Sequence, residues 1–140
     1  MGYRSEVLKA AYFPGGEAAV HAYIAALKIK GELTKTLEDG LQYFQVFNYN
    51  DGAVVMFHAE DTKWYSGYED VQTIEYFFDE VAELDDHETI HIRIGEERED
   101  IEERTSGDTF YLQDLFQLQR SINFDFDTTA PKPLIPPAAE

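Results

Sequence analysis

Two stretches of the chain repeat apolar residues at the spacing of a helix that buries one side. In the first stretch they stand at i, i+3, i+4 and i+7 and are Val20, Tyr23, Ile24 and Leu27. In the second they are Val71, Ile74, Phe77, Phe78, Val81 and Leu84. This spacing predicts two amphipathic helices. The first follows the turn residues Pro14-Gly15-Gly16 and ends near Gly31, and the second begins near Glu69.

Four other stretches are rich in apolar and aromatic residues in the manner of strands, and the last of them alternates so that one face would be buried. They are residues 3–12, 41–49, 53–59 and 90–94. Asn50-Asp51-Gly52 separates the middle two, and these residues tolerate the positive φ angles of a tight hairpin turn. We therefore predict a hairpin at this point and single strands before the first helix and after the second.

The resulting order is strand, helix, strand, strand, helix, strand. It predicts an α+β fold of the ferredoxin-like β-α-β-β-α-β type, an antiparallel sheet with two helices on one face. Residues 95–107 are expected to form a charged loop or a short helical turn. Residues 110–127 add an extra C-terminal strand, with a helical turn near 113–119 as the alternative. We expect one domain over residues 1–127 and a Pro-rich extended C-terminal tail over residues 128–140.

The charge of the chain lies mostly in one stretch. The formal net charge is −17, and residues 60–108 hold 18 of the 28 acidic residues but only four of the 11 basic ones. A nucleic acid or an anionic membrane surface would be repelled, so neither is expected as a direct ligand. Cysteine is absent, and we find no signal peptide and no apolar run of membrane-spanning length. We therefore expect a cytoplasmic protein.

Candidates for catalysis or metal binding are weak. His87 and His91 share one side of a strand, but roughly 13 Å of extended chain separates them, and we interpret them as exposed residues. The acidic run over residues 96–104 lacks the oxygen spacing of a Ca²⁺ loop and the paired environments of catalytic carboxylates. The serines lie in no Gly-x-Ser-x-Gly context. We predict no catalytic, cofactor or metal site and do not expect an enzyme.

The acidic stretch is a better candidate for binding a partner. Glu75, Asp79 and Glu83 are four residues apart and would project from one side of the second helix, about 6 Å from one to the next. Spaced carboxylates can imitate a phosphate backbone and occupy a basic groove, although acidic surfaces also simply keep proteins soluble. Four further acids complete the candidate surface: Glu96, Glu97, Glu99 and Asp100.

Trp64, Tyr65 and Tyr68 form an aromatic group between the hairpin and the second helix. Aromatic side chains in a loop can anchor a partner protein. The alternative is that they cover the end of the sheet core. We include all three in the predicted partner-binding surface.

Several short motifs resemble a group of small, uncharacterised proteins of tailed bacteriophages and prophages. The chain opens with Met-Gly-Tyr-Arg-Ser-Glu-Val, and the similarity continues at 63–65, 68–71, 93–96, 100–102 and 120–122. It covers residues 1 to about 126 and leaves the tail outside. The resemblance implies a phage setting, and hence the bacterial host cytoplasm. It supplies no functional residues.

Three functions are compatible with these features. The first is a non-enzymatic phage accessory protein that binds a host or phage protein, including a basic nucleic-acid-binding partner in the manner of a DNA mimic. The second is a virion or assembly component, and the third is a small metal-dependent hydrolase. The oligomeric state stays open, since an exposed edge strand can pair two copies of the chain.

Overall fold

The computed structural model describes residues 3–97, 99–107, 112, 115–118, 122–124 and 131–135. In chain order their elements are β1 (Ser5–Phe13), α1 (Glu17–Ile29), α2 (Lys35–Leu41), β2 (Phe44–Tyr49), β3 (Gly52–Thr62), α3 (Glu69–Ala82), β4 (Glu88–Gly95), β5 (Ile101–Ser106), β6 (Phe116–Leu118), β7 (Ile122–Phe124) and β8 (Lys132–Pro133). The fold is therefore α+β, as predicted.

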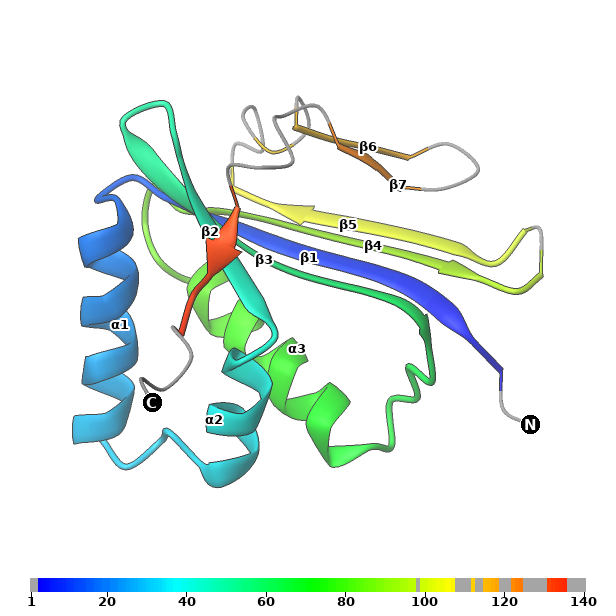
Figure 1. The fold of residues 1–140 in the computed structure, drawn as a ribbon, viewed down its shortest axis with the longest axis horizontal. Helices are drawn as coiled ribbons and strands as arrows, with labels where there is room; N and C mark the ends of the chain where they lie inside the picture. Colours follow the sequence, from blue (N-terminus) through cyan, green and yellow to red (C-terminus); the bar gives the residue numbers. More distant parts are fainter. Residues whose placement is uncertain are drawn as a thin grey trace.

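Six of these strands form one open antiparallel sheet in the order β5-β4-β1-β3-β2-β8. The long strand β1 lies inside the sheet and pairs with β3 on one side and with β4 on the other. Strands β5 and β8 are the two ends of this order (Figure 1). The remaining strands, β6 and β7, pair with each other in a separate antiparallel ribbon.

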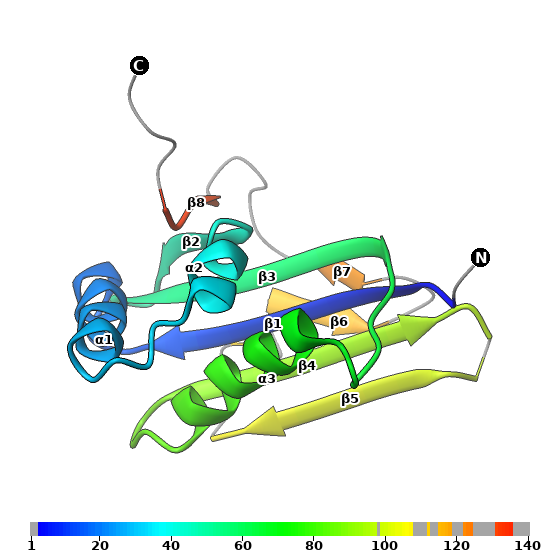
Figure 2. The ribbon, with the colours of Figure 1, turned by 90° about the horizontal axis from the view of Figure 1, so that it is seen from below.

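The sheet is covered differently on its two faces. Helices α1, α2 and α3 lie on one face, and the β6–β7 ribbon lies on the other (Figure 2). Because side chains alternate along a strand, β1 contributes to both sides. Val7 and Ala11 belong to the core beneath the helices, whereas Leu8 and Ala10 pack with Phe116 of β6 on the opposite face.

The two predicted helices and the hairpin are confirmed. Helix α1 buries Val20 and Leu27, and α3 buries five of its six predicted apolar residues, leaving out Leu84, which lies beyond the helix end. The hairpin turns at Asn50 and Asp51, whose φ angles are 49° and 63°. The next residue must be glycine, because a Cβ on Gly52 would lie 2.6 Å from the carbonyl oxygen of Phe13.

A third helix on this face corrects the prediction of two. Helix α2 occupies residues that we left unassigned and the first residue of a predicted strand, so that β2 begins at Phe44 instead of Leu41. The Thr34 hydroxyl accepts a hydrogen bond from the Leu37 backbone N–H at 3.1 Å and caps the helix start. Leu37 and Leu41 are both buried, so the segment is held by packing.

The prediction of a charged loop over residues 95–107 is wrong for most of its length. Only the turn before Ile101 fits that description, and β5 pairs with β4 from Ile101 to Ser106. Every β5 residue except Ser106 is exposed. A charged strand at the edge of a sheet keeps its side chains in water and discourages uncontrolled pairing with other chains, which is why the sequence resembles a loop.

The C-terminal segments add short strands to both layers. In place of one extra strand, the described residues beyond β5 contain β6, β7 and β8. Of the alternative helical turn over residues 113–119, Leu115 is helical, 116–118 form β6, and the other positions lie outside the described residues. Within the predicted tail, Lys132 and Pro133 pair with β2, and Leu134 is 1% exposed in the core beneath the helices. None of the helices in the described part of the chain is long and apolar enough to span a membrane.

Candidate functional site

An open groove runs between α3 and the edge of the sheet formed by β4 and β5. It has a volume of about 1140 Å³. Helix α3 lies over β1 and β4, and β5 extends beyond the helix layer (Figure 2). The groove exists because the sheet is wider than the helices that cover it.

The walls of the groove carry polar side chains from three parts of the chain. Helix α3 contributes Glu75 and Asp79, and the segment before it contributes Trp64 and Tyr65. The strands and their turn contribute Arg93, Asp100, Glu102, Glu103 and Arg104. Arg93, Glu102 and Arg104 face the helices, because Arg93 lies opposite Glu102 and His91 opposite Arg104. Glu103 lies opposite Ile92, which packs on the other face, so its side chain points away from the groove.

A buried lysine lies at the base of the groove. Lys9 of β1 is 2% exposed, and its Nζ lies 3.0 Å from Glu75 Oε2 and 5.7 Å from the centre of the Phe78 ring. Arg104 and the Trp64 indole N–H also contact the Glu75 carboxylate, at 3.2 and 3.3 Å. Three donors therefore converge on one carboxylate.

These contacts set the ionisation of the pair. Burial lowers the pKa of Lys9, and the Glu75 charge opposes this effect. Burial acts to raise the pKa of Glu75, but the charge and hydrogen bond of Lys9, together with nearby Arg104 and His91, outweigh it and the net pKa is lowered. Glu75 is therefore ionised at neutral pH, and its contacts inside the protein make it less available to a partner.

A second ion-pair group lies toward the turn between β4 and β5. Arg93 binds Asp100 through two nitrogens, at 2.6 and 3.0 Å, and its Nε lies 3.2 Å from Glu102 Oε1. The Tyr3 hydroxyl donates to Asp100 at 2.7 Å. Hydrogen bonds from Arg93 and Tyr3 hold the pKa of Asp100 at about 2, and this bidentate geometry fixes the turn.

His91 is buried, which corrects our interpretation of it as an exposed strand residue. It is 4% exposed beneath α3; its Nε2 lies 3.2 Å from Glu102 Oε1, and its Nδ1 has no hydrogen-bond partner among the described residues. Burial, together with the Lys9 and Arg104 charges, lowers its pKa to about 4. His91 is therefore neutral at physiological pH.

The structure brings only part of the predicted surface together. Trp64, Tyr65, Glu75, Asp79 and Asp100 all line the groove. The others lie outside its lining: Tyr68 precedes α3 and packs against Tyr65, Glu83 borders a separate hollow, and Glu96, Glu97 and Glu99 are exposed near the β4–β5 turn. Three carboxylates were predicted to project from one side of α3. Of these, Asp79 and Glu83 take part in none of the ion pairs between described residues.

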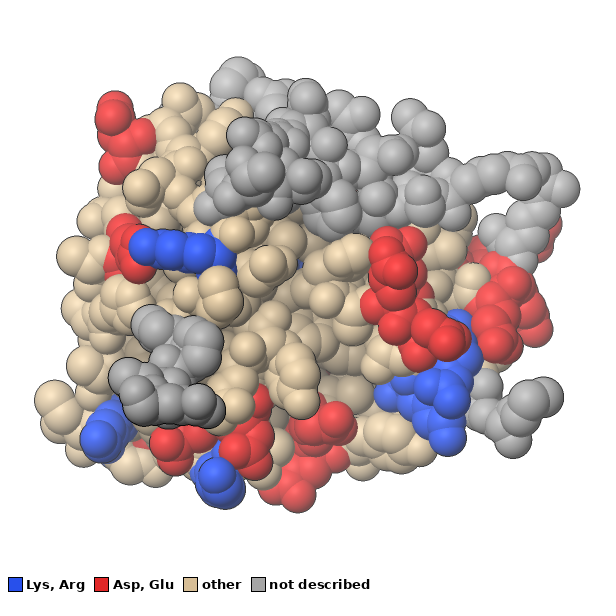
Figure 3. Space-filling model, viewed as in Figure 1, with Lys and Arg blue, Asp and Glu red and all other residues tan. Residues whose placement is uncertain are grey.

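Basic residues lie among the acidic ones on the surface drawn in Figure 3. The sequence did not identify Lys9, Arg93 and Arg104 as parts of the site, because each was considered only for its contribution to the net charge. The neighbours of Lys9 could have indicated its burial, since Lys9 interrupts the apolar β1 sequence Val-Leu-Lys-Ala-Ala. A cation at that position must be buried next to a carboxylate.

Comparison with known proteins gives no independent guide to this site, because no family model, no curated protein and no solved structure matches the chain.

Proposed function

We propose that this chain is a non-enzymatic binding protein whose partner, a host or phage protein, docks an extended basic segment into the groove between α3 and β5. The phage setting rests on the sequence resemblance alone. The chemistry of the partner is inferred from the groove.

The observation that carries the proposal is the combination of an acidic groove with an exposed edge strand. Four carboxylates lie on the groove side, those of Glu75, Asp79, Asp100 and Glu102, and they exceed the cations by one when Lys9 is counted with the two guanidinium groups. Asp79 has no ion-pair partner among the described residues. It would face a basic side chain of a partner.

Strand β5 suits an extended partner. It is the last strand in the sheet order, so its outer backbone N–H and C=O groups face away from β4. A segment that pairs with such an edge gains main-chain hydrogen bonds, and its alternate side chains would project over the groove. Trp64 and Tyr65, at the end of the groove, supply aromatic surface for an anchor residue.

The internal pairing of Glu75 favours this function over imitation of a long stretch of DNA. A mimic presents a regular row of free negative charges, and Lys9 removes the first charge from the row on α3. Asp79 and Glu83 remain, which is enough for local contacts with a basic peptide.

We also propose that the scaffold belongs to the ferredoxin-like class. The neighbour order β4-β1-β3-β2 is antiparallel throughout, and α1 and α3 connect β1 to β2 and β3 to β4. These features support a β-α-β-β-α-β unit. Helix α2 and strands β5 and β8 would then be additions to it, and the groove would lie on the added β5 edge.

Affinity capture from infected host lysate tests the function. The bait carries Asp79→Lys, at an exposed position on the groove. Glu38→Lys is the matched control, because it makes the same change in net charge at an exposed helix position outside the groove. We expect the wild type and the control to retain one partner at low salt, and the groove variant to lose it.

Equal capture by Asp79→Lys and Glu38→Lys would contradict the groove as the binding site. Recovery of the chain in purified particles would instead favour the structural, virion-component alternative.

A further inference from the structure

A β-bulge interrupts the pairing of β1 and β3. Ser5 lies opposite Thr62 but Val7 lies opposite Ala59, so β3 has one extra residue at this point. Asp61 adopts a positive φ of 53° there. Bulges of this kind redirect neighbouring side chains and are common beside functional sites.

The bulge lies beside a cluster of metal-ligand side chains. Glu6 of β1 and His58 and Glu60 of β3 offer ligand atoms that all lie within 4.8 Å of one another. His58 Nε2 is 2.7 Å from Glu6 Oε2, and both side chains are less than one-fifth exposed. Within the described part of the chain, this is the one group of three or more such side chains with this geometry.

This cluster and the groove lie on opposite faces of the sheet. Along β1 and β3, Glu6 and His58 alternate in step with Leu8 and Met56, which pack on the side of the β6–β7 ribbon. The cluster therefore takes no part in the proposed partner contact.

The cluster is electrostatically unbalanced. Two carboxylates on neighbouring strands repel each other, and one imidazole can neutralise only one of them. Arg4 is a cation close to Glu6 in the sequence, but its side chain donates a hydrogen bond to the backbone carbonyl of Asp61 at 3.2 Å. A divalent cation would neutralise both carboxylates at once.

We propose that Glu6, His58 and Glu60 bind a divalent first-row transition metal ion, with Zn²⁺ as the best match. One imidazole nitrogen with two carboxylate oxygens suits Zn²⁺ or Mn²⁺, whereas Mg²⁺ and Ca²⁺ prefer ligand sets made of oxygen alone. The two strands fix the three ligands, and water would complete the tetrahedral shell. The bound ion would hold β1 to β3 across the bulge.

Calorimetric titration of the untagged, chelator-treated chain with Zn²⁺ alone is the test. We expect saturation at one ion per chain and a melting temperature raised by roughly 5–10 °C when the free ion exceeds its dissociation constant by about 100-fold. Mg²⁺ and Ca²⁺ at the same concentration should give neither effect. Loss of a residue that only supports the metal ligands weakens metal binding by roughly 10- to 100-fold. Because Glu60 would itself be a ligand, Glu60→Gln should weaken binding by more than this.

Matched variants separate this site from general binding to surface carboxylates. His58→Ala should act like Glu60→Gln, and the latter changes an exposed residue, so it reports on binding even if His58→Ala disturbs the fold. His21→Ala is the control, because His21 forms an exposed pair with Glu17 at 3.3 Å without belonging to the three-ligand cluster. Absence of saturable binding, or equal weakening by Glu60→Gln and His21→Ala, would overturn the proposal.

Discussion

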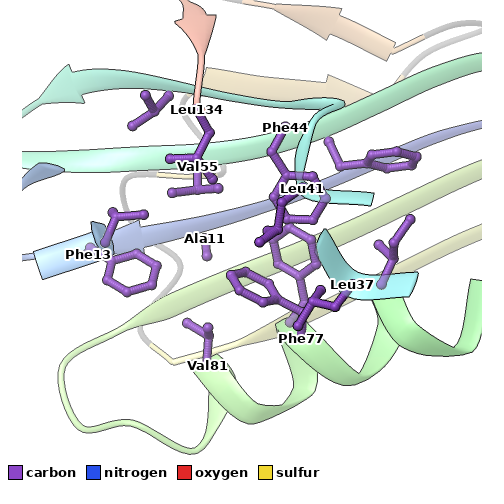
Figure 4. Packing of buried hydrophobic residues seen from close by; sticks show 14 of the residues in the cluster. Ala11, Phe13, Leu37, Leu41, Phe44, Val55, Phe77, Val81 and Leu134 are labelled. Carbon is purple, nitrogen blue, oxygen red and sulfur yellow. The ribbon is translucent and has the colours of Figure 1, made fainter. Parts of the chain in front are cut away.

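Helix α3 divides the helix-covered face of the sheet into two regions that are stabilised in different ways. Toward β1, β3 and β2 it buries an apolar face, where Phe77 and Phe44 lie between the helices and the sheet (Figure 4). Toward β5 the same helix presents Glu75 and Asp79 to charged side chains of the groove. The sequence of one helix therefore serves two environments.

The apolar region is closed because three helices cover it. Phe77 makes edge-on contacts with Tyr23, Phe44 and Phe78, with ring centres 5.3–5.7 Å apart. Such packing depends on area and shape and does not require individual partners. It is insensitive to pH.

The polar region depends instead on specific pairs. Lys9 lies at the boundary, because its ammonium group contacts both the Phe78 ring and the Glu75 carboxylate. Beyond it, none of the helices α1, α2 and α3 covers β5, and the side chains there stay exposed. The comparison teaches that covering a strand yields stability, whereas leaving it uncovered yields a charged surface, the one on which we place the proposed partner.

Truncation of Phe77 should have the largest effect on folding. Phe77→Ala removes a side chain that is 2% exposed, and the resulting cavity should lower the free energy of unfolding by about 3–5 kcal/mol. Urea denaturation followed by circular dichroism measures this value. The loss should be the same at pH 5 and pH 7, because the neighbouring core side chains do not titrate in that range.

The adjacent residue supplies the control. Tyr76 is 56% exposed and points away from this core, so Tyr76→Ala should change the free energy of unfolding by no more than about 0.5 kcal/mol. A comparable loss in both variants would mean that the two sides of α3 are not distinct in energy.

Acidification should weaken the polar region through His91. Its pKa falls from 6.5 in the unfolded chain to about 4 in the folded protein, so the unfolded state binds a proton first. Stability is therefore fully present above pH 6.5 and is lost as the pH falls toward 4. The loss should approach about 3 kcal/mol, from about 1.4 kcal/mol per pH unit.

The variant His91→Leu isolates this contribution, because it fills the buried space and cannot titrate. Measured as the difference in unfolding free energy between pH 7 and pH 4, the wild type should lose about 3 kcal/mol more than the variant. Parallel pH profiles would show that His91 is not buried in its neutral form.

The sequence predicted the apolar region better than the polar one. Helical spacing identified the buried face of α3, and Asn50-Asp51-Gly52 located the hairpin, because both signals are local and physical. Helix α2 was missed since it is only seven residues long and is held by the burial of Leu37 and Leu41. Tertiary packing of that kind leaves little periodic signal.

The groove could be predicted only in part. Acidic and aromatic residues that line it were identified from their spacing and composition, but their partners come from β1, β4 and β5, far away in sequence. Lys9 and Glu75 are 66 positions apart, and nothing local relates them. The pairing of β4 with β5 creates the Arg93–Glu102 contact, and that register is set by the sheet as a whole.

The Lys9–Glu75 pair should give the smallest of these effects on stability. Glu75→Gln keeps the shape of the side chain but removes the charge opposite an ammonium that is 2% exposed. Loss of one partner from a fully buried pair costs about 3–5 kcal/mol, and we expect about 2 kcal/mol here because the Glu75 side chain is 23% exposed. Urea denaturation at pH 7 measures it.

A double-mutant cycle with Lys9→Met decides whether the pair itself is responsible. Methionine fills the space of the lysine stem, so the double variant Lys9→Met/Glu75→Gln should recover most of the loss, since no charge is left unpaired beneath α3. Asp79→Asn, one turn further along the helix and exposed, should change stability by no more than about 0.5 kcal/mol. Strictly additive losses in the cycle would mean that Lys9 and Glu75 are not coupled, and the boundary between the two regions would then lie elsewhere.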